Sequence, residues 1–167
     1  GENFPIIMIS NVNLIGQGKE VTIIDAEQTD RVITMEYCQN NIISDLTITG
    51  GLADGIFVYK SYLTLKDVNL KFNNSNNGYY AAGVSCIESS SDMTNVNVYQ
   101  NMRGGIIIEN FFEMSIPRPL ANIFTNVNIM NNSGVGLSVY ISRWTADGCN
   151  EGNCIQTTLT NVTISGN

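Results

Sequence analysis

Short stretches in which apolar and polar residues alternate recur along the whole chain, separated by polar turns. Six of them share one form: an apolar and a polar residue, then Asn or Asp, then an apolar, a polar and an apolar residue. They are ISNVNLIGQG from residue 9, ISDLTITGG from 43, LKDVNLKFN from 65, MTNVNVYQN from 93, FTNVNIMNN from 124 and LTNVTISGN from 159. A second phrase, Gly followed by an alternating strand, lies between them: GIFVY from 55, GVSCI from 83, GIIIE from 105 and GLSVY from 136. Alternation over so few residues predicts strands rather than helices.

The spacing of these phrases predicts a coil of stacked rungs. Their Asn or Asp residues lie 22 to 35 residues apart, and no interval contains a helical pattern. Parallel strands need long crossovers, so a repeat of this length without helices stacks as an all-β solenoid of about five to six rungs. A sharp bend between sheets calls for a left-handed backbone, which Asn and Asp tolerate. We therefore expect a structural turn ladder, with side chains bonded from rung to rung, at Asn11, Asp45, Asp67, Asn95, Asn126 and Asn161.

The same register predicts which side chains form the core. The Gly-led strands are expected to turn inward Val32, Ile56, Val84, Ile106 and Leu137, with Thr34, Val58, Cys86, Ile108 and Val139 two residues later. Two further inward ladders are Val12, Leu46, Val68, Val96, Val127 and Val162, paired with Leu14, Ile48, Leu70, Val98, Ile129 and Ile164, and then Ile9, Ile43, Leu65, Met93, Phe124 and Leu159. Segment 17–30 fits the register poorly, and we expect it to hold an extra strand, VTIID, in an irregular first rung.

Composition adds limits on the class of protein. With 167 residues, 43% of them hydrophobic and 14% charged, residues 1–167 are expected to form one domain with its own core. Eight Lys and Arg against fifteen Asp and Glu give a net charge of −7, which disfavours nucleic acid and other anionic partners. No stretch approaches eighteen consecutive apolar residues, so no membrane span is expected.

At this point the chain resembles the right-handed parallel β-helix repeat proteins of the pectate-lyase-like superfamily, in particular secreted or cell-surface bacterial proteins. The resemblance rests on rungs such as LTNVTISGN alternating with Gly-led strands, and it covers essentially the whole chain. It implies an extracellular or cell-surface location and leaves the activity open, because this architecture carries lyases, hydrolases, esterases, adhesins and tailspikes. In the enzymes of this superfamily, the outer face of the Gly-led sheet and the loops beside it form the polysaccharide groove.

That face offers candidate ligand-binding residues in this chain. Its outward positions are expected to be Ile33 and Met35, Phe57 and Tyr59, Ser85 and Ile87, Ile107 and Glu109, and Ser138 and Tyr140, with long insertions beside the last three strands. The predicted sugar-stacking platform comprises Tyr59, Tyr79, Tyr80, Tyr140 and Trp144, with Glu109 and Arg143 as polar contacts. The alternative is that these aromatic side chains only cover an otherwise exposed apolar sheet.

Cysteines and acidic residues give little support for a metal or cofactor. The four cysteines lack paired zinc spacing and the chain contains no His, so no metal site and no cofactor is predicted. Cys149 and Cys154, in CNEGNC, favour a local disulfide and hence an oxidising compartment, with two free thiols in a cytosolic loop as the alternative. The loop DGCNEGN at 147–153 carries oxygen ligands suited to calcium, but it also fits an ordinary turn-rich loop.

Two classes of function follow. The first is a non-catalytic module that binds glycans or a protein partner, or builds a surface assembly by stacking the open ends of the coil. The alternative is a polysaccharide lyase or glycoside hydrolase, or a fragment of one. Non-catalytic roles are favoured because the predicted outer face supplies a single acid, Glu109, whereas a glycosidase uses two carboxylates. The absence of an amphipathic capping segment also favours a slice of a longer repeat protein.

Overall fold

The computed structural model describes residues 3–74, 81–111, 120–142 and 156–167, which form sixteen strands in two sheets. The six-stranded sheet contains β1 (Ile6–Ile7), β4 (Ile33–Glu36), β6 (Ile56–Tyr59), β8 (Ala82–Ile87), β11 (Gly104–Phe111) and β14 (Val135–Ser142). The ten-stranded sheet contains β2 (Leu14–Ile15), β3 (Ile23–Asp25), β5 (Asn41–Thr49), β7 (Tyr62–Lys71), β9 (Ser90–Thr94), β10 (Asn97–Tyr99), β12 (Ala121–Thr125), β13 (Asn128–Met130), β15 (Gln156–Thr160) and β16 (Thr163–Ser165). Within these ranges, no helix is long and apolar enough to cross a membrane.

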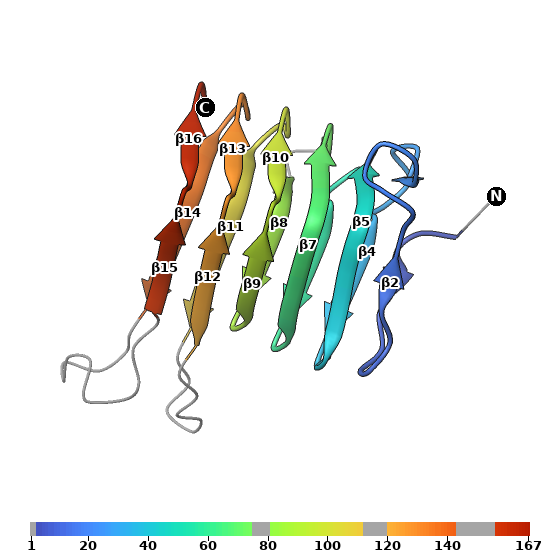
Figure 1. The fold of residues 1–167 in the computed structure, drawn as a ribbon, viewed down its shortest axis with the longest axis horizontal. Helices are drawn as coiled ribbons and strands as arrows, with labels where there is room; N and C mark the ends of the chain where they lie inside the picture. The colour runs from blue at the N-terminus through green and yellow to red at the C-terminus, as the bar shows by residue number, and fades with distance from the viewer. Residues whose placement is uncertain (1–2, 75–80, 112–119, 143–155) are drawn as a thin grey trace.

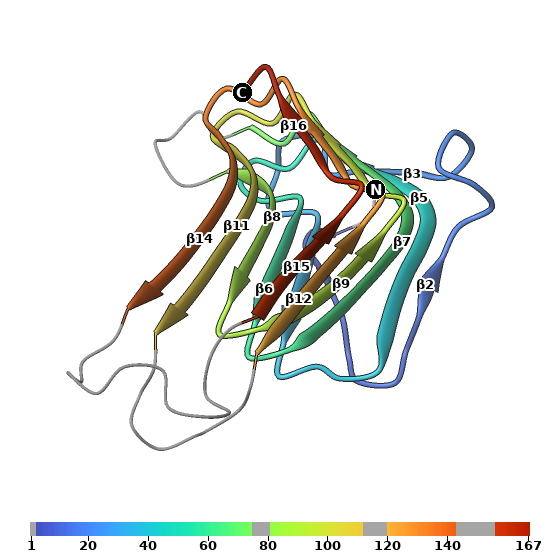
Figure 2. The ribbon, with the colours of Figure 1, turned by 60° about the vertical axis from the view of Figure 1, so that its left-hand side comes forward.

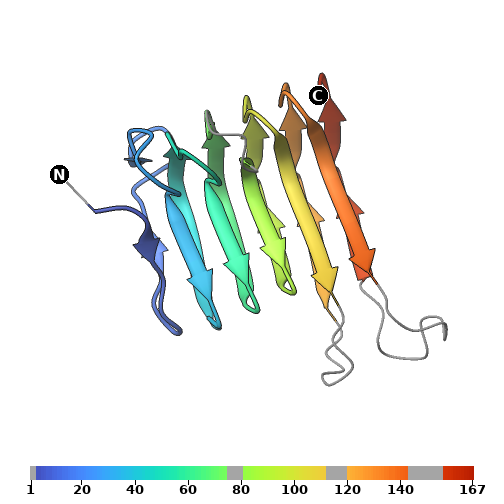
Figure 3. The same ribbon diagram turned by 180° about the vertical axis from the view of Figure 1, so that it is seen from behind.

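The strands stack as successive rungs of one coil, as the repeat spacing predicts. The pairings of β4 with β6, β6 with β8, β8 with β11 and β11 with β14 are all parallel, and each joins one rung to the next. Figure 1 shows the ten-stranded sheet in front, and Figure 3 shows the six-stranded sheet from dark blue β1 to orange β14. The ten-stranded sheet bends along its middle, so the coil has three sides when it is seen more nearly along its axis (Figure 2). The described strands therefore lie on three sides of one interior.

The interior is filled by the inward ladders, and the middle rungs follow the predicted register. The rows that contain Val96, Val98, Ile106 and Met93 are fully buried across the central rungs. Cys86 is fully buried in the six-stranded sheet, and this burial raises the pKa of its thiol to about 12. A buried aliphatic side chain contributes roughly 1.5 to 3 kcal/mol of transfer free energy, so these ladders are the main source of stability.

The register predicted for β4 is wrong by one residue. Ile33 pairs with Ile56 and Met35 with Val58, so Ile33 and Met35 face the interior and are fully buried, while Thr34 and Glu36 face outward. The sequence misleads here because Val32 occupies the position that Gly takes in the later rungs, and the Ile33 amide accordingly donates to the Gly55 carbonyl.

The corner residues Asp45, Asp67, Asn95, Asn126 and Asn161 adopt a left-handed backbone, with φ between 52° and 58°. The Asn95 amide donates to Asp67, Asn126 to Asn95 and Asn161 to Asn126, each over 3.1 Å. Asparagine side chains therefore link four successive rungs along this corner.

Asn11 does not belong to this corner, which corrects its predicted place. Its φ is 65°, but its side chain accepts a hydrogen bond from the Asn40 amide at 3.0 Å, at a different corner. Gly16 takes the place beside Asp45: Leu14 pairs with Ile43, and the Gly16 amide donates to the Ser44 carbonyl. Ile9 and Val12 are consequently exposed rather than buried. The cause is an insertion, residues 16–22, which separates β2 from β3 at this corner.

Segment 17–30 contains the expected extra strand. Residues Ile23–Asp25 form β3, which pairs with the second half of β5 and completes the first rung. The preceding loop folds back over the outer side of β5, where the Lys19 carbonyl accepts a hydrogen bond from the Thr47 hydroxyl. The Glu20 carboxylate accepts from the Asn69 amide at 3.2 Å, so the loop also reaches the next rung (the blue loop beside β5 in Figure 1).

A second asparagine ladder, not expected from the sequence, runs through the interior. The Asn73 amide donates to Asn101, Asn101 to Asn132 and Asn132 to Asn167, each over 2.9 Å. Each accepting oxygen also accepts a hydrogen bond from the backbone N–H of the donor residue, at 3.0 to 3.2 Å. These residues lie six positions after Asp67, Asn95, Asn126 and Asn161, a fixed spacing that was visible in the repeats.

Candidate functional site

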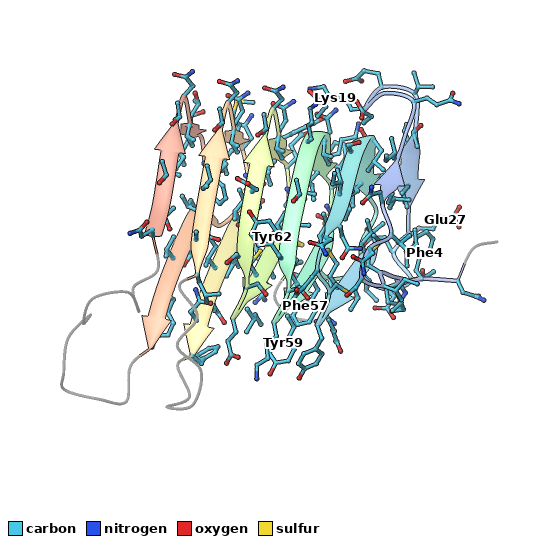
Figure 4. The ribbon with its side chains drawn as sticks, turned by 60° about the horizontal axis from the view of Figure 1, so that its bottom comes forward. Phe4, Lys19, Glu27, Phe57, Tyr59 and Tyr62 are labelled. Carbon is cyan, nitrogen blue, oxygen red and sulfur yellow. The ribbon has the colours of Figure 1, made fainter. Side chains whose placement is uncertain are left out.

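The outer face of the six-stranded sheet carries a straight row of side chains, one from each of five rungs. We call this the outer row: it consists of Glu36, Tyr59, Ile87, Glu109 and Tyr140, which pair in register on β4, β6, β8, β11 and β14. Successive members are one strand spacing apart, about 4.8 Å. Tyr59 and the neighbouring Phe57 project from β6 on the same side of the sheet (Figure 4). The structure thus places three of the predicted binding residues, Tyr59, Glu109 and Tyr140, in one line.

Two aromatic pairs lie three rungs apart on this face, each formed by one tyrosine of the outer row and an aromatic residue beside it. Tyr37 packs edge-on against Tyr59, with ring centroids 5.5 Å apart, and Phe111 packs against Tyr140 at 6.3 Å. The rings are accessible to a ligand: Tyr37 is 64% exposed, Tyr140 54% and Phe111 43%. Tyr37 and Phe111 were not predicted as site residues because they follow the alternating segments. An aromatic residue just after such a segment would have indicated them.

One cation of this face is already engaged at the corner beside Tyr59. Lys60 Nζ lies 3.3 Å from a Glu88 carboxylate oxygen and 5.1 Å from the centre of the Tyr59 ring. The interaction with the Tyr59 side chain and then that with Glu88 raise the pKa of Lys60. The ammonium group therefore stays charged and paired within the protein.

A second cation beside this face, Arg31, is held by a buried acid. Arg31 Nε lies 3.2 Å from Asp54 Oδ2, and its guanidinium carbon lies 4.2 Å from the centre of the Phe57 ring. Asp54 is almost completely buried and also accepts hydrogen bonds from the Ser85 hydroxyl at 2.7 Å and from the Ala82 amide at 3.1 Å. Burial raises the pKa of Asp54, against the opposing effect of these donors. The cluster ties three rungs together and fixes Arg31 in place.

Several predicted site residues lie outside the described part of the chain. They are Tyr79, Tyr80, Arg143 and Trp144, together with the disulfide candidates Cys149 and Cys154 and the calcium candidate loop 147–153. Within the described residues, no group of three or more His, Cys, Asp or Glu side chains is placed to hold a metal ion. The site that can be described is therefore a surface of rings and carboxylates on the six-stranded sheet.

Two solved structures are similar to this chain over 95% of its length. They are crystal structures of the periplasmic alginate epimerase AlgG, with a TM-score of 0.64 and 14% identical residues, and of a point mutant of that protein, with a TM-score of 0.64 and 15%. The fold is a right-handed parallel β-helix. The chain spans 35% and 36% of the two AlgG chains, so the likeness concerns the coil and not the whole enzyme. No protein-family model matches the chain, and no curated protein sequence matches it.

Proposed function

We propose that this chain is a non-catalytic, extracytoplasmic β-helix module that binds a glycan along the outer row. The observation that carries the proposal is the placement of two aromatic pairs on one face of the coil: Tyr59 and Tyr140 belong to the outer row, and the exposed rings of Tyr37 and Phe111 pack beside them. Flat rings present apolar faces on which the C–H faces of sugar rings stack, and carboxylates beside them accept hydrogen bonds from hydroxyl groups. Because the rungs are stacked in register, an extended chain of sugars can lie along the coil axis.

The structural neighbours support a polysaccharide as the class of ligand. AlgG is described as a periplasmic alginate epimerase, and its coil has the same fold. An extracytoplasmic location for this chain agrees with that neighbour. Alginate itself is a less suitable ligand here, because it is anionic and this chain carries a net charge of −7.

A binding role is preferred over hydrolysis because of the spacing of the carboxylates. Glu36 and Glu109, the two acids of the outer row, are separated by three rungs, about 14 Å. Glycosidases hold their two carboxyl groups roughly 5 to 9.5 Å apart. The intervening acid, Glu88, is paired with Lys60. These described acids do not form the pair that glycoside hydrolysis requires.

The test is binding of neutral, acidic and amino polysaccharides, measured by titration calorimetry, with product analysis in the same samples. We expect the double variant Tyr59→Ala/Tyr140→Ala to weaken binding by at least about tenfold, equivalent to 1.4 kcal/mol. Tyr62→Ala is the matched control, since Tyr62 is 40% exposed on the ten-stranded sheet and should not affect binding. Oligosaccharide products that disappear in Glu109→Gln would contradict the proposal and establish the enzymatic alternative.

A second candidate function, assembly by end-to-end stacking, has its own observation. Leu159 and Ile164 in the last rung are exposed, although the same two rows are fully buried at Phe124 and Ile129 one rung earlier. A further rung of the coil, or a second copy of this chain stacked on it, would cover them and pair the open strand edges. This self-association is compatible with glycan binding, since the outer row lies on a side of the coil.

A further inference from the structure

The charges on the outer face point to the kind of glycan. Among the residues that the structure describes, the cations Arg31 and Lys60 of this face are bound to Asp54 and Glu88. Glu36 and Glu109 form no ion pair with any residue that the structure describes. Along the described part of this face, the charge that these ion pairs leave uncompensated in the outer row is therefore negative.

Each of these two carboxylates has a tyrosine directly opposite on the next strand. Glu36 pairs in register with Tyr59, and Glu109 pairs with Tyr140. A carboxylate next to an aromatic ring is suited to an ammonium group, which gains a charge-assisted hydrogen bond from one and a cation–π contact from the other. The two Glu–Tyr pairs repeat after three rungs, about 14 Å along the coil axis.

We infer that the outer row recognises an extended polysaccharide that carries free amino groups, such as a deacetylated hexosamine polymer. The inference rests on the proposed glycan-binding function and adds the charge of the ligand. A linear polymer places ammonium groups at regular intervals along its length, so two of them can reach the two Glu–Tyr pairs at once. The net charge of −7 acts in the same direction, because it attracts polycations and repels polyanions over longer distances.

The experiment compares three oligomers of equal length by titration calorimetry: a glucosamine hexamer, an N-acetylglucosamine hexamer and a uronic acid hexamer. We expect the glucosamine hexamer to bind at least about tenfold more tightly than the acetylated one, and the uronic acid hexamer to bind most weakly. Affinity for the glucosamine hexamer should fall as salt is raised, because exposed charge pairs are screened.

Charge-removing variants separate a specific site from general attraction. Glu36→Gln and Glu109→Gln should each weaken binding of the glucosamine hexamer about fivefold or more and leave the acetylated hexamer unaffected. Glu27→Gln is the matched control: Glu27 is exposed in the turn between β3 and β4 (labelled in Figure 4), and its loss removes the same charge elsewhere. Thermal unfolding followed by circular dichroism checks that each variant is folded.

Each of the remaining outcomes counts against the inference in a different way. Equal affinity for the amino and acetylated hexamers, lost in Tyr59→Ala/Tyr140→Ala, would overturn the charge preference and keep the glycan-binding function. If the uronic acid hexamer bound more tightly than the glucosamine hexamer, the charge preference would likewise be overturned and the glycan-binding function kept. An equal loss of affinity for the glucosamine hexamer in Glu27→Gln and Glu109→Gln would show that binding depends only on the net charge of the protein. Absence of binding to all three hexamers and to the polysaccharide panel would overturn both proposals.

Discussion

An asparagine side chain carries a donor and an acceptor, so one residue type can repeat through stacked rungs and leave neither group unpaired. Asn101, fully buried, donates to Asn132 Oδ1 and accepts from Asn73 Nδ2, each over 2.9 Å. We expect Asn101→Ala to lower the free energy of unfolding by about 2 to 5 kcal/mol, because buried partners on both neighbouring rungs lose a hydrogen bond. Urea denaturation measures this. Asn126→Gly, in the exposed corner ladder, keeps the left-handed backbone accessible and should cost less than about 1 kcal/mol; equal losses would contradict the difference in burial.

Asp54 makes the free energy of unfolding depend on pH. The sign of this dependence follows from the burial of Asp54, which raises its pKa in the folded state. Such a carboxyl stabilises the fold most below its unfolded pKa of about 3.9, and this contribution is lost as the pH rises through the folded value. We expect the free energy of unfolding of Asp54→Asn to fall less than that of the parent between about pH 4 and neutrality. Urea denaturation across this range measures both slopes. An Asp54→Asn variant whose slope equals that of the parent would refute the assignment.

At the scale of the element, the register of β4 is open to a direct test. Met35 faces the interior and is fully buried, whereas Ile15 of β2 faces outward and is 63% exposed. Met35→Ala should lower the free energy of unfolding by about 2 to 5 kcal/mol, since it leaves a cavity in the core. Ile15→Ala should change it by less than about 0.5 kcal/mol. Chemical denaturation of the two variants compares them, and a small loss for Met35→Ala would restore the outward assignment.

The middle rungs could be predicted from the sequence because each repeats the same polar, Asn and apolar positions, so that one register explains all of them. The first rung could not. Its phrase at residue 9 matches the repeat in letters, but the insertion 16–22 moves Gly16, not Asn11, to the corner beside Asp45. An insertion at a bend leaves the local pattern intact while it changes the pairing partner, and only the structure shows this.

The side chains of the candidate site that lie on strands could be predicted from the sequence, whereas those at the corners could not. Tyr59, Glu109 and Tyr140 follow from simple alternation along β6, β11 and β14, which places them on the outer face. Tyr37 packs on Tyr59 from a corner with φ of 55°, a conformation that is unusual for an aromatic residue, so alternation says nothing about its direction. The pairing of Arg31 with Asp54 likewise depends on two turns that meet only when the rungs stack.

At the scale of the whole molecule, added salt is expected to affect the two proposed functions in opposite ways. Binding of an ammonium-bearing glycan to an acidic face weakens as salt is added. Stacking of two copies, each with a net charge of −7, should strengthen, because screening removes their repulsion while burial of the apolar end is unaffected. The same titration of salt therefore moves the two proposed functions in opposite directions.

The assembly prediction uses two isoleucines of similar exposure in different places. Ile164 in β16 is 48% exposed on the last rung, and Ile123 in β12 is 42% exposed on a side of the ten-stranded sheet. We expect light scattering to show a mass that rises with protein concentration, and more steeply at high salt. Ile164→Lys should reduce this mass to that of the monomer, since a lysine at the stacking end places an unpaired charge in an apolar contact, whereas Ile123→Lys should leave it unchanged. A parent chain that stays monomeric at every concentration and salt would exclude stacking, and equal effects of the two variants would place the contact on the side of the coil.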